Sequence, residues 1–233
     1  MEITLVCFAN SRKKHGRCFA GKNLKDKRWI RPISNRTTQE LIEKEECIKD
    51  VDCNCIICEP EIPKLMDIIK IQTTTNDLKD HQSENYLISD EKWLRVGKLD
   101  SLDIDDYLDS NTNVLWVNGH SSYNRLNDRV PEKLMNEITD SLKLIEVDRL
   151  SIRVVEEHYL DGNHRKRVYG EFEYKGISYI LPITDYRFER DFMKKDPGTR
   201  QVFSSEDRVI LCISLASEFE GYCYKLIAGI ILI

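Results

Sequence analysis

The residues with the clearest potential for chemistry form a basic segment near the N-terminus. Between Ser11 and Arg31 the chain carries nine lysines and arginines against one acidic residue, Asp26. Cations attract phosphate groups and release counterions, and an exposed tryptophan offers a surface on which a base can stack. The segment therefore predicts nucleic-acid contacts made by Arg12, Lys13, Lys14, Arg17, Trp29 and Arg31. The alternative is a solvated loop with Trp29 in the hydrophobic core.

A second polar stretch, residues 118–131, combines turn formers, amides, hydroxyls and arginines. Side chains of these types read base edges or bind phosphates, which makes Ser121, Asn124 and Arg129 candidate nucleic-acid contacts. The alternative is a long ordered loop in which the side chains cap their own backbone.

A third cluster, residues 164–167, reads His-Arg-Lys-Arg and falls in an expected β-turn. Arg165 and Arg167 are candidates to join the first cluster in holding phosphates. Alternatively, these charges keep an edge strand soluble.

Four cysteines lie close together in sequence, at Cys47, Cys53, Cys55 and Cys58. Thiolates suit tetrahedral zinc, but only Cys55 and Cys58 have the usual C-x2-C spacing, and no second pair follows. We expect no cofactor and an acidic insertion with incidental thiols, and zinc at these four cysteines is the alternative.

Motifs for catalysis are missing from the sequence. The chain has no P-loop, no G-x-G-x-x-G and no G-x-S-x-G, and its five histidines show no metal-ligand spacing. Cys18 and His15 are three residues apart, which places them on opposite faces of an extended strand. We therefore expect no catalytic residues.

The composition is that of a globular protein. The 233 residues are 41% hydrophobic and 32% charged, with a formal net charge of −5. This excludes a globally basic nucleic-acid binder, but a local basic face remains open. The N-terminus lacks a basic leader, and no apolar stretch reaches the roughly 18 residues of a membrane helix. We expect a cytoplasmic protein with no membrane segment.

The elements that must position these residues are mainly strands. Apolar or alternating runs predict strands at 3–9, 18–21, 28–33, 66–72, 92–96, 142–147, 149–155, 166–174, 177–183, 209–215 and 221–233. Lys175-Gly176 between two alternating runs predicts a hairpin turn. Short helices are expected at 37–48, 99–110 and 131–140, and residues 73–90 are expected to form a loop.

Five or six short strands after residue 140 fit a small barrel or sandwich. We place a domain boundary there, with an N-terminal domain of residues 1–140 that has long loops and a C-terminal domain of residues 141–233. Periodicity alone supports the β class only for the second half.

Several motifs together resemble the bacterial dual OB-containing domain family over essentially the whole chain. They begin with Ser11-Arg12-Lys13, Gly16-Arg17-Cys18-Phe19-Ala20-Gly21 and Trp29-Ile30-Arg31-Pro32-Ile33-Ser34. They continue with Gln82-Ser83-Glu84-Asn85, the Asn-Gly loop of residues 118–131 and the chain end Glu220-Gly221-Tyr222-Cys223-Tyr224-Lys225-Leu226. The cysteine-rich segment is an insertion relative to this pattern.

The resemblance implies two small OB-like β-barrels with a few short helices. It also implies a non-catalytic module that binds or senses nucleic acid or a nucleotide, in prokaryotic defence or genome maintenance. Two alternatives stay open, because fold does not fix function. One is a regulatory module that binds a protein partner through its acidic residues 100–109, and the other is an enzyme acting on nucleotides or modified bases.

Overall fold

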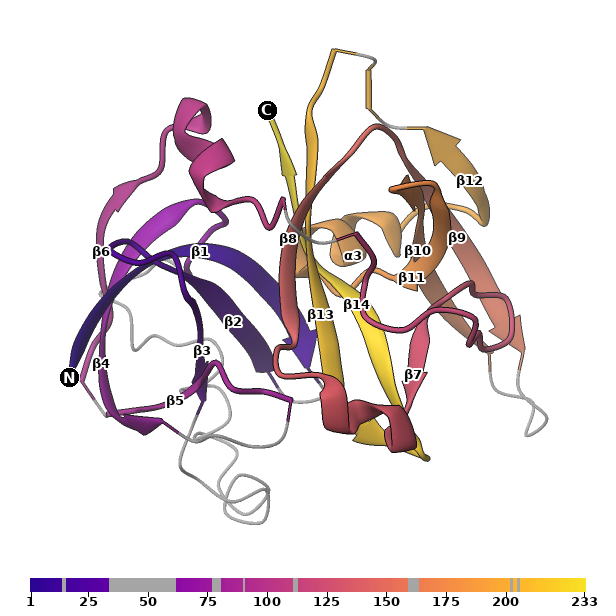
Figure 1. Ribbon diagram of the computed structural model, residues 1–233. Coiled ribbons are helices and arrows are strands. Elements are labelled where there is room, and N and C mark those ends of the chain that lie inside the picture. Colours follow the sequence, from indigo (N-terminus) through magenta and orange to yellow (C-terminus); the bar gives the residue numbers. More distant parts are fainter. Residues whose placement is uncertain are drawn as a thin grey trace. The chain divides into compact units, whose positions relative to one another are not determined.

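The computed structural model describes residues 1–13, 16–33, 62–76, 81–89, 91–110, 113–158, 164–201, 203–204 and 206–233. These residues form two compact units (Figure 1). The first unit is Met1–Tyr107 with Thr139–Ser141, and the second is Leu108–Ile138 with Leu142–Ile233. The domain boundary expected at residue 140 stays a prediction. No described helix is long and apolar enough to cross a membrane.

The first unit contains a closed five-stranded barrel. Its strands pair in the order β1–β2–β3–β5–β4, and β4 pairs back with β1 to complete the ring. β3 and β5 run parallel, whereas the other neighbours in the ring are antiparallel. A further strand, β6, pairs with β4 outside the ring. The bounds are β1 (Glu2–Lys13), β2 (Gly16–Asn23), β3 (Trp29–Ile33), β4 (Asp67–Asn76), β5 (Asn85–Ile88) and β6 (Leu94–Lys98).

Alternation along the strands builds the core of this barrel. Successive side chains of a strand point to opposite faces, so Ile3, Leu5 and Cys7 of β1 face inward together. They pack with Ile69 and Ile71 of β4, and all five are nearly or fully buried. The apolar pattern of the sequence thus sets which face of β1 and β4 is inside.

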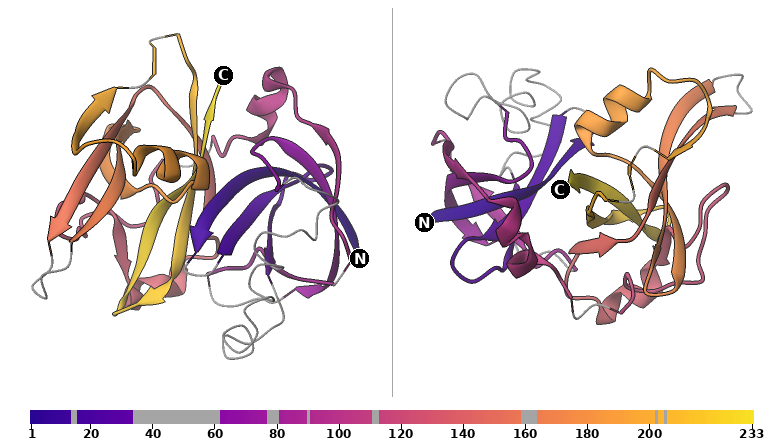
Figure 2. Two further views of the ribbon diagram at one scale, coloured as in Figure 1. Left: turned by 180° about the vertical axis from the view of Figure 1, so that it is seen from behind. Right: turned by 90° about the horizontal axis from the view of Figure 1, so that it is seen from above.

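The second unit has the same strand order, built from two half-barrel sheets (Figures 1 and 2). β8 and β9, separated by a tight turn, together take the place of the first strand, because β9 pairs with β10 and β8 pairs with β13. A parallel bridge between Ile183 and Ile227 joins the end of β11 to β14. The bounds are β7 (Arg129–Pro131), β8 (Leu142–Val147), β9 (Leu150–His158), β10 (His164–Tyr174), β11 (Ile177–Pro182), β12 (Gly198–Gln201), β13 (Val209–Phe219) and β14 (Tyr222–Leu232).

Helices are short. η1 (Ser101–Tyr107) and η2 (Glu132–Glu137) are 3-10 helices, in the regions where short helices were predicted. α3 (Tyr186–Phe192) follows β11, and its Phe188 and Phe192 pack against the core of the second barrel. The carboxylate of Asp185 caps α3 by accepting hydrogen bonds from the backbone N–H groups of Arg187 and Phe188, each at 3.0 Å.

The predicted mainly β fold with OB-like barrels and a few short helices is confirmed. The predicted hairpin at Lys175-Gly176 is also confirmed, since both residues have positive φ and Tyr174 pairs with Ile177. The prediction of a loop over residues 73–90 was wrong, because β4 extends to Asn76 and β5 lies at 85–88. The expected helix at 37–48 and the four clustered cysteines lie outside the described residues.

The close packing of β1 against β2 in the first barrel can be tested by substitution of Gly21. A Cβ added to Gly21 would lie 2.0 Å from the carbonyl oxygen of Val6, a backbone atom that cannot move aside. We predict that Gly21→Ala lowers the free energy of unfolding by about 3 kcal/mol or more, measured by urea denaturation.

Gly97→Ala in β6 is the matched control, because its Cβ would meet only the side chain of Ile68 at an ordinary 3.6 Å. We expect it to change the free energy of unfolding by less than about 1 kcal/mol. Equal effects of the two substitutions would contradict the pairing of β1 with β2.

Candidate nucleic-acid interface

The basic N-terminal segment folds into the β1–β2 hairpin. Antiparallel pairing places Arg12 opposite Arg17 and Lys13 opposite Gly16. Arg12 is exposed and Arg17 is half-buried, and the sequence holds no acidic residue between Ile3 and Lys25. We call Arg12, Lys13 and Arg17 the basic hairpin. Lys14, also predicted as a contact, lies outside the described residues.

Trp29 lies toward the other end of β2, where it pairs with Lys22. Five residues of strand separate Lys22 from Arg17, which corresponds to about 17 Å. The half-buried Trp29 ring packs edge-on against Phe8 with centroids 6.2 Å apart, and the ammonium of Lys22 lies 5.0 Å from its centroid. The described cations of this segment are therefore separated along β2, with Arg12 and Arg17 at one end and Lys22, Lys27 and Arg28 toward the other.

Acidic groups accompany the cations at this second end. The Lys27 ammonium lies 3.8 Å from the ring centroid of Tyr107, the last residue of the acidic η1 helix. Arg28 pairs with Asp26 at 2.6 Å, and this side-chain hydrogen bond lowers the pKa of Asp26 below its ordinary value. The positive charge of this end is therefore partly balanced within the unit.

Arg31 belongs to a buried polar network rather than to the surface. Its guanidinium lies 3.2 Å from the carboxylate of Glu84 and donates to the hydroxyl of Ser141 at 2.8 Å. It also donates to the side-chain oxygen of Asn85 at 3.5 Å. Only 10% of the Arg31 side chain and 4% of the Glu84 side chain are exposed. Removing one partner of such a buried pair typically lowers the free energy of unfolding by about 3–5 kcal/mol. The position of Arg31 is therefore explained by its contribution to stability.

In the second unit, residues 118–128 pair with the edge of β11 and reach over the outer face of β9 and β10, and we call them the covering segment. Leu126 bridges to Ile180 of β11, and the side-chain amide of Asn127 donates to the carbonyl of Ser178 at 3.0 Å. Arg153 of β9 donates to the carbonyl of Asn124 at 2.6 Å. In OB barrels the face of the second and third strands commonly binds oligonucleotides, and here the chain itself covers part of that face.

Tyr169 marks the centre of the covered face. It is fully buried, with the guanidinium carbons of Arg125 and Arg153 lying 5.5 and 5.6 Å from its ring centroid. Its hydroxyl donates to the carboxylate of Glu157. Burial, and then this hydrogen bond, raise the pKa of Tyr169 above its ordinary value.

The covering segment is fastened to itself by its polar side chains. The hydroxyl of Ser121 accepts a hydrogen bond from the backbone N–H of Asn127 at 3.0 Å. The fully buried carboxylate of Asp128 accepts from the backbone N–H of Ser122 at 2.7 Å and also from its hydroxyl. Asn124 has φ of 60° and is exposed. The geometry of Ser121 therefore favours the alternative of a self-capped loop.

A buried lysine ties this segment to the last strand. Lys225 of β14 is fully buried, and its ammonium donates to the carbonyl of Val117 at 2.7 Å and to the side-chain oxygen of Asn118 at 2.9 Å. Its backbone N–H donates to the carbonyl of Asp128 at 2.8 Å. Burial lowers the pKa of Lys225 from 10.5 to about 7, and the nearby charge of Asp128 opposes that shift.

The remaining predicted contacts are dispersed over the second unit. Arg129 in β7 lies over the ring of Tyr222, 4.0 Å from its centroid. Arg167 lies 3.6 Å from the carboxylate of Glu157, whereas Arg165 is exposed at the start of β10. Sequence reasoning missed Lys225, although strand alternation places it on the same side as the buried Cys223 and Ile227.

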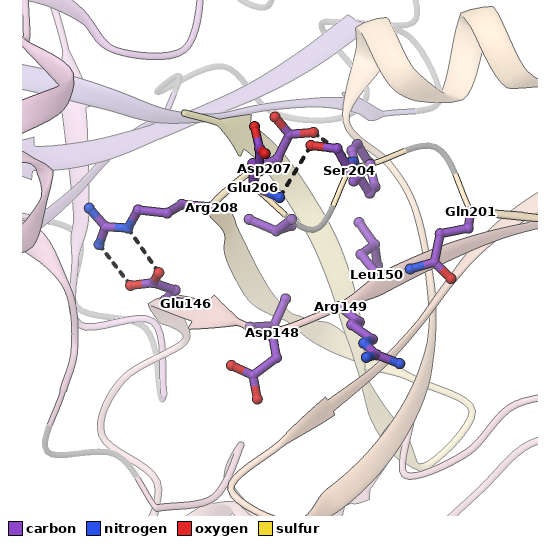
Figure 3. A pocket seen from close by; sticks show the side chains of 12 residues that line it. Glu146, Asp148, Arg149, Leu150, Gln201, Ser204, Glu206, Asp207 and Arg208 are labelled. Carbon is purple, nitrogen blue, oxygen red and sulfur yellow. Dashed lines mark hydrogen bonds and ion pairs between the residues drawn. The ribbon is translucent and has the colours of Figure 1, made fainter.

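A cavity of about 500 Å³ opens in the second unit between the β8–β9 turn and residues 201, 203–204 and 206–209 (Figure 3). Its lining includes Val147, Leu150 and Val209 of the core, and a bidentate pair in which Arg208 donates to Glu146 at 2.9 and 2.8 Å. It contains none of the predicted site residues. An enzyme acting on nucleotides stays a prediction.

Metal binding finds no support among the described residues, where no three His, Cys, Asp or Glu side chains lie close enough to hold an ion. Cys7, Cys212 and Cys223 are free cysteines buried in strands. The alternative of zinc at Cys47, Cys53, Cys55 and Cys58 stays a prediction.

Comparison with known proteins gives one extensive match. A family model described as the dual OB-containing domain matches residues 3–230. No curated protein matches the chain.

Two solved structures are distantly similar, and likenesses this weak say nothing of what the chain binds. The tetrameric p202 HIN2 structure has a TM-score of 0.29 and 9% identity, covering 100% of this chain and 93% of that one. A murine DNA-binding protein bound with double-stranded DNA has a TM-score of 0.28 and 11% identity, covering 100% and 97%.

The buried Lys225 makes the stability of the second unit depend on pH. Its folded pKa of about 7 lies below its ordinary value of 10.5, so between these values the unfolded chain binds more protons than the folded chain. This group therefore makes the free energy of unfolding rise with pH, by up to roughly 1.4 kcal/mol per pH unit. We predict that Lys225→Met removes this rise, measured by urea denaturation between about pH 7 and pH 10.

Lys133→Met, at an exposed position of the same unit, is the control and should follow the wild-type profile. Parallel profiles for wild type and Lys225→Met would refute the depressed pKa. If Lys225→Met does not fold, a carbon-13 NMR titration of the Lys225 side chain in the wild-type protein gives the same pKa directly.

Proposed function

The chain belongs to the dual OB-containing domain family, and we propose that it binds single-stranded nucleic acid through the basic hairpin of its first barrel. OB barrels bind oligonucleotides with the second and third strands and with the loops at the ends of strands one–two and four–five. Arg12, Lys13 and Arg17 occupy the end of the strand one–two hairpin. As the family resemblance implies, we place this activity in bacterial defence or genome maintenance, and, as the sequence led us to expect, in the cytoplasm.

The single observation that carries the proposal is the pairing of Arg12 with Arg17 across the hairpin. Two arginines at opposed positions, with Lys13 next to Arg12 in sequence, concentrate positive charge in a chain whose net charge is −5. Local charge of this kind steers and holds phosphates regardless of the global balance. Arg31 does not belong to this contact, because its guanidinium is committed to Glu84 and Ser141.

A comparison of the two barrels supports the choice of the first. In the second barrel Leu126 pairs with the edge of β11, and Arg125 of the covering segment lies over Tyr169 on the outer face of β10. In the first barrel the corresponding strands β2 and β3 keep Arg17 and Trp29 half-exposed. A base stacked beside Trp29 of β3 would lie about 17 Å along the sheet from phosphates held by Arg17 of β2.

A protein partner is the second candidate, favoured by a separate surface of the first unit. Leu102 in η1 is 85% exposed among the exposed Asp103, Asp105 and Asp106. An exposed leucine amid carboxylates suits a basic, amphipathic partner better than a phosphate backbone.

We predict that Arg12→Gln with Arg17→Gln weakens binding of single strands of about 16 nucleotides, the upper site size of one OB fold. Each lost phosphate contact lowers the dependence of log affinity on log salt by roughly 0.7, so the slope should fall by about 1.4. Fluorescence anisotropy with labelled oligothymidylate and oligouridylate, from about 50 to 200 mM salt, measures both quantities.

Lys92→Gln with Lys98→Gln removes two exposed cations from the same unit and should bind like the wild type. The proposal fails if the wild type binds neither oligonucleotide at low salt. It also fails if the Arg12 and Arg17 variant keeps the wild-type affinity and slope.

A further inference from the structure

The hairpin β9–β10 of the second barrel holds the same place in the strand order as the basic hairpin of the first. It too carries cations where its second strand begins, at His164, Arg165, Lys166 and Arg167. β10 pairs with β9 from His164 onward but with β11 only from Tyr169 onward, so residues 164–167 have a strand neighbour on one side only. Charges at such a position also protect the exposed edge, and the case for a binding surface therefore depends on the cations that a second element adds beside them.

The segment that follows α3 adds to this cluster. The ammonium of Lys166 donates to the backbone carbonyl of Lys195 at 2.9 Å. A few residues later, Gly198 pairs with Val154 of β9, which fixes the segment beside the same hairpin. Two elements far apart in sequence are thereby joined, and Lys194 and Lys195 are both exposed.

The charges of this surface are only partly neutralised. Arg167 lies near Glu157, and His164 lies 4.0 Å from Glu156. Asp196 is the acidic neighbour of Lys195 in sequence. Among the described residues, no ion pair engages the side chains of Arg165, Lys194 or Lys195, and all three are exposed.

We propose that Arg165, Lys194 and Lys195 form a second phosphate-binding surface for single-stranded nucleic acid, on the second unit. This rests on the proposed function. Three exposed cations contributed by a hairpin end and a post-helical segment suit the spaced charges of a phosphate backbone. Binding here does not require the covered face of β9 and β10, so the covering segment and the second surface are compatible.

The test uses the full chain and a labelled oligothymidylate of about 30 nucleotides, roughly two OB site sizes. Lys194→Glu with Lys195→Glu should lower the slope of log affinity against log salt by at least about 1.4, because two contacts at roughly 0.7 each are lost. In the wild type, bound oligonucleotide should protect Lys194 and Lys195 from acetylation, read by mass spectrometry.

Lys133→Glu with Lys175→Glu is the matched control, since it changes the net charge equally at two exposed lysines of the same unit. It should keep the wild-type slope. Loss of slope confined to the Lys194 and Lys195 variant, together with protection of those lysines, supports the second surface.

Other outcomes overturn the inference in distinguishable ways. If the Lys194 and Lys195 variant binds like its control while Arg12→Gln with Arg17→Gln loses affinity, the second surface is wrong and the proposed function stands. If the wild type binds no oligonucleotide, the proposed function fails and this inference fails with it. If polyglutamate protects Lys194 and Lys195 but oligothymidylate does not, the surface recognises an acidic protein instead.

Discussion

The closure of each barrel depends on parallel pairing between its third and fifth strands, which we call the seam. A sheet with open edges exposes unpaired backbone groups, and closure removes them. In the first barrel β3 pairs with β5 from Arg31–Asn85 to Ile33–Leu87, and the buried Arg31–Glu84 ion pair lies at the start of this pairing. In the second barrel the seam narrows to the bridge between Ile183 and Ile227.

Polar side chains reinforce the second seam as well. Asp185 follows directly after β11, and its carboxylate accepts the backbone N–H of Ile230 at 3.0 Å while also capping α3. The two seams are thus stabilised by different polar residues, and in both the effect is to keep the barrel closed. Closing a barrel pairs the strand edges with one another, which leaves the hairpin ends and the outer faces of the strands free to bind a ligand. In the second barrel the covering segment already lies over the outer face.

The sequence predicts well where physical patterns are local. Alternation identified β10 and β11, and Lys175-Gly176 identified their turn. β5 was missed because its short Asn85-Tyr86-Leu87-Ile88 sequence has no alternating pattern, and its place depends on parallel pairing with a distant strand. β12 and α3 were also missed, since a four-residue strand and a seven-residue helix carry little periodic signal.

The candidate site shows the same limit. Arginine is rarely buried, so nothing in the sequence separated the buried Arg31 from the exposed Arg12. The family motif around Glu84 is explained only when Glu84 and Ser141 meet Arg31 in space. Likewise, the chain-end motif and the Asn-Gly loop are far apart in the sequence, and the hydrogen bonds of Lys225 to Val117 and Asn118 join them in the structure.

The central claim is that nucleic acid meets this chain at basic hairpin ends while the covering segment stays in place. Amide hydrogen exchange, with and without saturating oligothymidylate, tests it most directly. The account predicts slower exchange in β1 and β2 near Arg12 and Arg17, and unchanged exchange in residues 118–128 and in β11. Altered exchange across the covering segment and β11, with none in the β1–β2 hairpin, would contradict it.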